Sequence, residues 1–185
     1  MDHASPDPLS QLLADFTPAT PQEAADVARV LALADAGNPW DRAMPLHVTA
    51  SALVVHPPTG RVLLRWHERQ QAWLQIGGHG DPGEADPLGV ALREGTEETG
   101  LSDLVPWPTA ALRHVVIVPV PGNDREPAHE HADLRFFLTT NEPERAVPEK
   151  PTAELRWLST ADAASLTTEA NVRDTIGRLA ALIRG

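Results

Sequence analysis

The sequence contains no cysteine and no tyrosine, a single lysine, and no long apolar run. Without cysteine, a disulfide framework, a thiolate zinc site and a cysteine nucleophile are all excluded, and the composition fits a reducing compartment. No stretch approaches the roughly 20 apolar residues that a membrane span needs. Residues 1–6 lack the basic region and apolar core of a signal peptide. We therefore expect a cytoplasmic protein with no membrane partner.

Positive charge is also scarce, and the formal net charge at pH 7 is −11. Such a surface repels polyanions, so we expect no nucleic-acid partner. An acidic protein can still bind a phosphorylated small molecule if the electrostatic potential at the binding site is made locally positive. Divalent cations bound by carboxylates would have this effect. The charge balance therefore directs attention to clustered acidic side chains.

The length of 185 residues and the apolar content of 42% predict one main domain with a modest appendage. We place the appendage at residues 1–45 and the main domain at residues 46–185. Thr20, Pro21 and Glu23 form a capping-box pattern that begins a helix in the appendage. The appendage would be a pair of helices packed on the domain or on a partner chain, which leaves a homodimer open; a lid over the substrate is the alternative.

The main domain alternates strand patterns with helix patterns. We expect strands at residues 47–55, 61–66, 73–76, 111–120, 133–139 and 154–158, and helices at residues 87–99 and 171–183. Strands interleaved with two helices predict an α/β fold in which a mixed sheet lies between helical layers.

The helix at residues 87–99 carries an unusual concentration of acid. At roughly 100° of turn per residue, Glu94, Glu97 and Glu98 fall on one side. The opposite side would face the core and consists of Leu88, Ala91, Leu92, Gly95 and Thr99. Carboxylates at spacings of three and four residues repel one another, and only Arg93 is near enough to offset them. A rigid carboxylate face of this kind is what an oxygen-seeking Mg²⁺ or Mn²⁺ requires.

A glycine-rich loop precedes this helix, with glycines at Gly77, Gly78, Gly80 and Gly83. Glycines permit unusual backbone angles and close approach of main-chain groups. A loop carbonyl could therefore join a metal shell, and Glu84 could reach back to the helix. A turn followed by a charged surface helix is the alternative for either half alone, but the combination favours a metal site.

Loop and helix together resemble the Nudix box, G-x5-E-x7-R-E-U-x-E-E-x-G-U, in which U is a bulky aliphatic residue. The matching positions are Gly78, Glu84, Arg93, Glu94, Glu97, Glu98, Gly100 and Leu101. The sequence departs from the pattern twice. Eight residues, not seven, separate Glu84 from Arg93, and Gly95 replaces the first aliphatic residue after Glu94. We expect the turn before the helix to absorb the extra residue, and Gly95 to weaken the helix by about 1 kcal/mol relative to alanine.

The resemblance implies a Nudix-type α/β/α sandwich with Mg²⁺ or Mn²⁺ as cofactor. Glu97 and Glu98 would bind the metal directly, with Glu94 close by and the carbonyl of Gly77 as an additional ligand. Arg93 would orient these carboxylates by pairing with Glu84 or Glu97. The substrate would be a small-molecule nucleotide or another diphosphate.

The general base of such an enzyme is a box glutamate or a carboxylate from a later loop. We favour Glu149, which lies in a loop before the strand that ends near Trp157, over Glu142 and Glu144. An exposed loop acid without a catalytic role is the alternative.

Four further residues are candidates for binding substrate. Arg65 and Arg69 flank the entry to the third strand and could bind phosphate, although solvated arginines are common. His79 lies within the box loop. His131 belongs to a group with His129 and Asp133 on one side of an extended segment. That group could form a second metal site, contact substrate, or consist of residues that satisfy one another.

These features predict metal-dependent hydrolysis of a diphosphate bond in a nucleoside diphosphate linked to another moiety. The alternative from another class is a Nudix-fold module that senses a nucleotide metabolite without turnover, for which degenerate box carboxylates would be expected. Isomerase chemistry on an isoprenoid diphosphate normally needs a reactive cysteine, which is absent.

Overall fold

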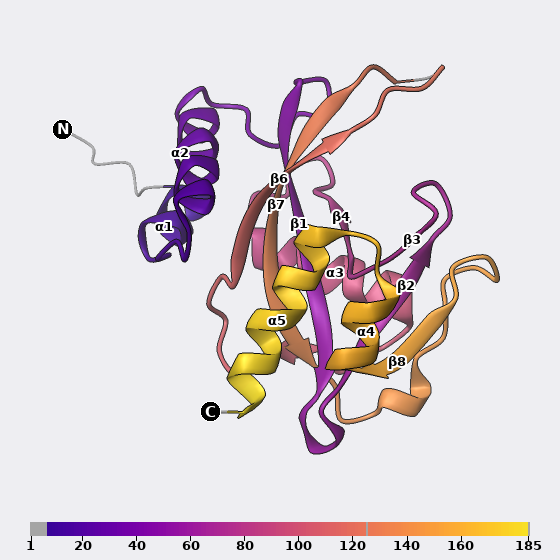
Figure 1. Ribbon diagram of the computed structural model, residues 1–185. Helices are drawn as coiled ribbons and strands as arrows, with labels where there is room; N and C mark the ends of the chain where they lie inside the picture. Colours follow the sequence, from indigo (N-terminus) through magenta and orange to yellow (C-terminus); the bar gives the residue numbers. More distant parts are fainter. Residues whose placement is uncertain (1–6, 125, 185) are drawn as a thin grey trace.

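The computed structural model describes residues 7–124 and 126–184 (Figure 1). The prediction that there is no signal peptide concerns residues 1–6, and these lie outside the described residues. The helices are α1 (Pro8–Ala14), α2 (Pro21–Asp35), α3 (Pro87–Thr99), α4 (Thr160–Leu166) and α5 (Ala170–Arg184), with short 3₁₀ turns at Pro57–Thr59 and Pro143–Arg145. The strands are β1 (Leu46–His56), β2 (Arg61–His67), β3 (Ala72–Leu74), β4 (Ile76–His79), β5 (Val105–Pro106), β6 (His114–Val120), β7 (His129–Thr139) and β8 (Leu155–Ser159).

All of these strands join one mixed sheet around β1. β1 pairs in parallel with β7 along almost its whole length, and antiparallel with β2 and β4. β5 and β6 extend the sheet beyond β7, while β3 and β8 pair with β2. The parallel partner of β1 thus comes from a segment far along the chain, and this pairing brings distant residues side by side.

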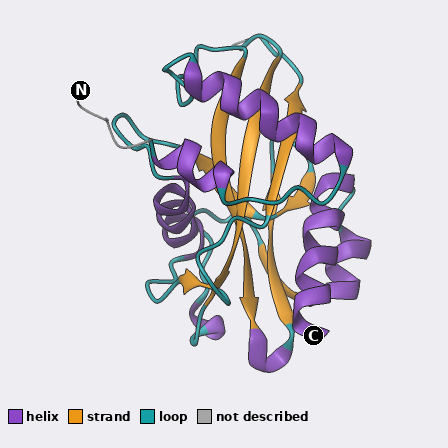
Figure 2. Ribbon diagram, turned by 90° about the vertical axis from the view of Figure 1, so that its left-hand side faces the viewer, coloured by secondary structure: helices purple, strands orange, loops and turns teal. Residues whose placement is uncertain are grey.

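Helices cover both faces of the sheet, as Figures 1 and 2 show. One apolar cluster joins α1, α2 and α3 to one face, and a second joins α4 and α5 to the other. The successive residues Val54 and Val55 of β1 belong to different clusters, as expected for a strand buried on both faces. The predicted α/β/α sandwich with N-terminal helices is confirmed. In the described part of the chain, no helix is both long and apolar enough to cross a lipid bilayer.

The structure corrects several predicted boundaries. β7 begins at His129 rather than at residue 133, because its polar start is held in register by parallel pairing with the start of β1. β6 begins at His114 rather than at residue 111, and the expected third strand is divided into β3 and β4. Helix α4 was not predicted, although Ser159 caps it by accepting a hydrogen bond from the N–H of Asp162.

The N-terminal helices are tied to the sheet by polar contacts as well as by apolar burial. Thr20 caps α2 as predicted, but the Glu23 carboxylate accepts from the Ala19 N–H, not from the Thr20 N–H of a capping box. Glu23 also accepts from the Val115 N–H, and Asp26 accepts from the Ile117 N–H, so α2 satisfies main-chain donors of β6. Leu9 of α1 is fully buried in the core that this contact covers.

Candidate active site

The glycine pair at the start of the box loop allows the loop to pass between β1 and α3. Gly77 pairs with Ser51 of β1 at a φ of 143°, where a Cβ atom would lie 2.5 Å from the Ser51 Cα atom. A Cβ atom on Gly78 would lie 2.7 Å from a carboxylate oxygen of Glu94. Only glycine fits at Gly77, where the neighbouring atoms belong to the backbone, whereas a side chain at Gly78 would displace the carboxylate of Glu94. The Gly77 N–H donates to Glu98 at 3.1 Å.

Helix α3 presents its three acids to one side of this loop. Asp86 caps its first turn, Pro87 occupies the first helical position, and Gly100 ends it in the left-handed conformation. The side chains of Glu94 and Glu98 are only 16% and 13% exposed, whereas that of Glu97 is 55% exposed. Two of the three glutamates on the predicted carboxylate face are therefore embedded in the protein, and the third is exposed.

Arg93 connects the loop to the carboxylate face. Its guanidinium donates to Glu84 at 3.0 Å, to Glu94 at 3.1 Å and to Glu97 at 3.0 Å. It also donates to the carbonyl of His79 at 2.8 Å. The hydrogen bonds from Arg93 lower the pKa of Glu84. Glu84 thus reaches Arg93 although the segment between them is one residue longer than in the family pattern.

Two opposing effects act on the pKa of Glu98. Burial raises its pKa to about 7, and Arg65 and the Gly77 N–H oppose that effect. Arg65 is itself buried, 3.2 Å from Glu98 and 3.4 Å from Glu149. Burial likewise raises the pKa of Glu94, and the neighbouring Arg93 opposes this increase. The two embedded carboxylates therefore have less positive charge nearby than their ionisation requires, and an added divalent cation would supply it.

Two hollows lie near this group, one beside the Gly77 and Gly78 backbone and the other beside Glu98. The first is lined by Thr49, Ser51, Leu74, Gln75, Gly77, Gly78, His79, Val118, His131, Asp133, Arg135, Asn171 and neighbouring residues. The second, on the Glu98 side, is lined by Arg65, Trp66, His67, Glu68, Arg69, Glu98 and Lys150. The first has a polar floor and the second combines three cationic side chains with a buried carboxylate.

Comparison with known proteins identifies the family. A model of the NUDIX domain matches residues 45–179. The chain belongs to the Nudix family. It is a Nudix hydrolase, of a kind that acts on diphosphates. No curated protein matches the sequence significantly.

Several solved structures share the Nudix fold. The dihydroneopterin triphosphate pyrophosphohydrolase of E. coli superimposes with a TM-score of 0.56 and 20% identity, over 73% of this chain and 94% of that chain. An Ap4A hydrolase of C. elegans gives a TM-score of 0.58 and 18% identity, over 75% and 98%. The M. smegmatis Nudix hydrolase RenU gives 0.53 and 26%, over 75% and 86%.

The Nudix fold brings together most of the residues proposed from sequence. Glu94, Glu97, Glu98, Arg93 and the Gly77 backbone form one group, and Arg65 links Glu149 to it. Arg69 lies at the rim of the second hollow, where it pairs with Glu126 at 2.8 Å. Whether these residues bind metal or substrate stays a prediction.

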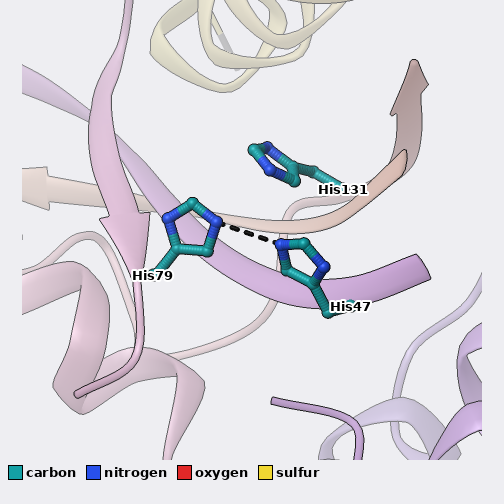
Figure 3. A group of neighbouring side chains, drawn as sticks. All are labelled: His47, His79 and His131. Carbon is teal, nitrogen blue, oxygen red and sulfur yellow. Dashed lines mark hydrogen bonds between the residues drawn. The ribbon is translucent and has the colours of Figure 1, made fainter. Parts of the chain in front are cut away.

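The two proposed substrate-binding histidines lie in a cluster that the sequence did not reveal. His79 and His131 both line the first hollow, and their rings pack edge to face with centroids 4.7 Å apart. The fully buried His47 completes the cluster, as Figure 3 shows. His47 opens a strand and has no motif of its own. Only its register opposite His131 in the parallel β1–β7 pair gives it this place.

Asp133 belongs to a neighbouring polar network rather than to the histidine cluster. It is buried and accepts hydrogen bonds from Thr49, Ser51, Gln75 and Arg135. Burial would raise the pKa of Asp133, but Arg135 and the hydroxyl donors hold it below its ordinary value. This ionised carboxylate orients the floor of the first hollow.

Proposed function

We propose that the chain is a Mg²⁺- or Mn²⁺-dependent hydrolase of a nucleoside diphosphate linked to another moiety. The observation that carries this proposal is the pair of embedded carboxylates, Glu94 and Glu98, held against a glycine backbone beside a cationic hollow. Burying two acids so close together is costly unless a cation accompanies them.

The donor set fits a hard divalent cation. Glu94, Glu97, Glu98 and the carbonyl of Gly77 are oxygen ligands of the type that Mg²⁺ and Mn²⁺ prefer. When bound, such an ion neutralises phosphate oxygens and lowers the pKa of a coordinated water. The part of Arg93 is to hold Glu84, Glu94 and Glu97 in fixed orientations before substrate arrives.

Glu149 is the residue that we propose as general base. Arg65 donates to it at 3.4 Å while also contacting Glu98, so the two acids share one guanidinium. A carboxylate placed this way can accept the proton of an attacking water beside the box. Because Glu149 lies in a loop, its side chain can also adjust when substrate binds.

The two hollows suggest where each part of the substrate binds. Arg65, Arg69 and Lys150 would attract the phosphates into the second hollow, close to Glu98. The attached moiety would enter the first hollow. There the Oε1 atom of Gln75 is buried and accepts no hydrogen bond from the described residues, so it suits a donor on the ligand. The names of the E. coli and C. elegans proteins agree with a small molecule that contains linked phosphates.

The charge and composition of the chain bear on the partners and the cellular compartment of the proposed activity. The net charge of −11 disfavours nucleic acid as a partner, and the absence of cysteine fits the cytoplasm. A homodimer would be compatible with the proposal but is not required by it, since all proposed site residues come from one chain.

A nucleotide panel with Mg²⁺ or Mn²⁺ and product analysis tests the function. We expect metal-dependent release of a phosphorylated product, and a rate lower by about two or more orders of magnitude for Glu98→Gln. Glu149→Gln should lower kcat by about 100-fold or more, the usual contribution of a general base. Glu144→Gln, in the same region of the chain, is the matched control and should retain wild-type rates.

Two outcomes would contradict the proposal. If no nucleotide on the panel is hydrolysed with either metal, the chain is not this enzyme. If a nucleotide raises the melting temperature but is never turned over, the sensing module is the better description.

A further inference from the structure

Three imidazole rings from three different strands meet beside the first hollow. His47 comes from β1, His79 from the end of β4 and His131 from β7 (Figure 3). One ring nitrogen from each lies within 4.8 Å of the others. The pairing of β1 with β7 places His47 directly opposite His131, and the pairing with β4 places His79 opposite Thr49, two residues away. The cluster is thus built by the sheet itself.

The orientation of His47 is the one that a metal ligand needs. Its Nδ1 atom lies 3.0 Å from the carbonyl of Met44, which can only accept, so this nitrogen carries the hydrogen. The Nε2 atom of the neutral ring therefore presents its lone pair, and it faces the Nε2 atom of His79 at 3.0 Å. Metal-bound histidines almost always donate their second ring N–H to a carbonyl or carboxylate in this way.

His129 is oriented in the same way as His47, and it lies against His131. Its Nδ1 atom donates to the carbonyl of Pro127 at 2.9 Å, and its Nε2 atom lies 3.0 Å from the Nε2 atom of His131. Its ring also stacks on that of His47, with centroids 5.3 Å apart. An apolar core would not need four neighbouring imidazoles, two of them with tautomers set by backbone carbonyls, so the arrangement itself calls for an explanation.

Burial of the rings favours the neutral protonation state, which is the one that metals bind. Burial is the main cause that lowers the pKa of all three, to about 3 for His79 and about 4 for His131. Neutral imidazole is a ligand for Zn²⁺ and related transition metals, whereas Mg²⁺ prefers oxygen. The cluster therefore differs in chemistry from the box carboxylates.

We propose that His47, His79 and His131 form a Zn²⁺ site separate from the box. With Zn–N distances of about 2.0–2.1 Å, tetrahedral ligands lie about 3.3 Å apart, close to the separation of the His47 and His79 Nε2 atoms. The cation would take the place of the hydrogen between these two atoms, and His79 would carry its proton on Nδ1 instead. Three protein ligands leave one position for water or an anionic substrate group, on the side where His79 and His131 line the hollow.

Calorimetric titration of the full-length protein with ZnCl₂, after removal of metals with a chelator, tests the site. We expect the Glu97→Gln/Glu98→Gln double variant, whose box is disabled, to bind one equivalent of Zn²⁺. In that background His79→Asn and His131→Asn should each weaken binding by about 100-fold or more, since loss of even an outer-shell partner costs 10- to 100-fold. His56→Asn is the matched control. It is the last residue of β1, where it bonds to Thr59, and its replacement should leave Zn²⁺ binding unchanged.

A second readout separates a histidine site from loss of folding. His79 and His131 are only half-buried, so their variants should melt cooperatively near the wild-type temperature without metal. With Co²⁺ in place of Zn²⁺, the box-disabled protein should show the visible absorption of a low-symmetry nitrogen-rich site, and the histidine variants should not. Zn²⁺ affinity that survives both histidine substitutions would overturn the proposal. So would disappearance of all Zn²⁺ binding in the box-disabled variant, or displacement of Zn²⁺ by Mg²⁺ there; none of these results would bear on the hydrolase assignment.

Discussion

At the scale of single residues, Arg93 performs the largest number of tasks in the candidate active site. Its guanidinium contacts three carboxylates and one carbonyl, so it fixes the loop and the helix relative to each other. Helical spacing predicts its contact with Glu97, four residues away. The contact with Glu84 depends on how the segment between the two residues folds, and that segment is one residue longer than in the family pattern.

Arg93→Lys should lower kcat/KM by about 10- to 100-fold, although the charge is kept. A lysine ammonium is a point charge and cannot hold four acceptors in a planar fork, so the carboxylates would lose their common orientation. Steady-state kinetics across a Mg²⁺ titration would measure the loss, with a higher metal requirement expected. Arg61→Lys, an exposed position at the start of β2, is the control. Wild-type kinetics for Arg93→Lys would contradict the proposed orienting role of Arg93.

At the scale of elements, Gly95 shows how a helix is adjusted to its neighbours. Sequence reasoning assigns it a cost in helix stability and no benefit. In the structure, a Cβ atom there would lie 2.8 Å from a methyl of Leu104 and 2.9 Å from one of Ile76. Those side chains occupy the space that a larger residue at this position would need. The core side of α3 also includes Val90, which the expected face omitted.

Gly95→Leu should therefore reduce the free energy of unfolding by about 1–3 kcal/mol, the usual result of overpacking a close-packed core. Denaturant unfolding monitored by circular dichroism would measure it. The matched control is Gly177→Leu in α5, where a Cβ atom would have no neighbour within 4 Å. That substitution should be neutral or stabilising, by up to about 1 kcal/mol, because leucine favours the helix more than glycine does. Equal effects at the two sites would show that helix propensity, not packing, decides.

At the scale of the whole molecule, the N-terminal helices are part of the sandwich rather than a loose addition. The Glu23 carboxylate is 3% exposed and accepts hydrogen bonds from α2's own entry, from β6 and from Arg178 of α5. One side chain therefore joins three elements. Burial alone would raise its pKa, but Arg178 and the two N–H donors lower it below the ordinary value.

Glu23→Gln should destabilise the protein by about 3 kcal/mol at pH 7, because it leaves Arg178 without its buried partner. A carboxyl with a lowered pKa in the folded state stabilises above its unfolded pKa of 4.5, and loses that contribution as the pH falls further. The difference between wild type and variant should thus shrink below pH 4.5. Thermal unfolding across this pH range tests it. Glu154→Gln, which removes half of an exposed pair with Arg156, should have little effect.

Local rules were sufficient for the helix at residues 87–99 and its acidic face. Asp86, Pro87 and Gly100 set its ends, and the spacing of the glutamates sets their side, because both effects act within one or two turns. The box, and with it the family, could therefore be identified from the sequence alone. Other features depend on contacts across long stretches of chain. The meeting of His47 with His131, the burial of Arg65 between Glu98 and Glu149, and the space around Gly95 follow from strand pairing and core packing. Pairing register and packed volume belong to the assembled sheet, so only the tertiary structure decided them.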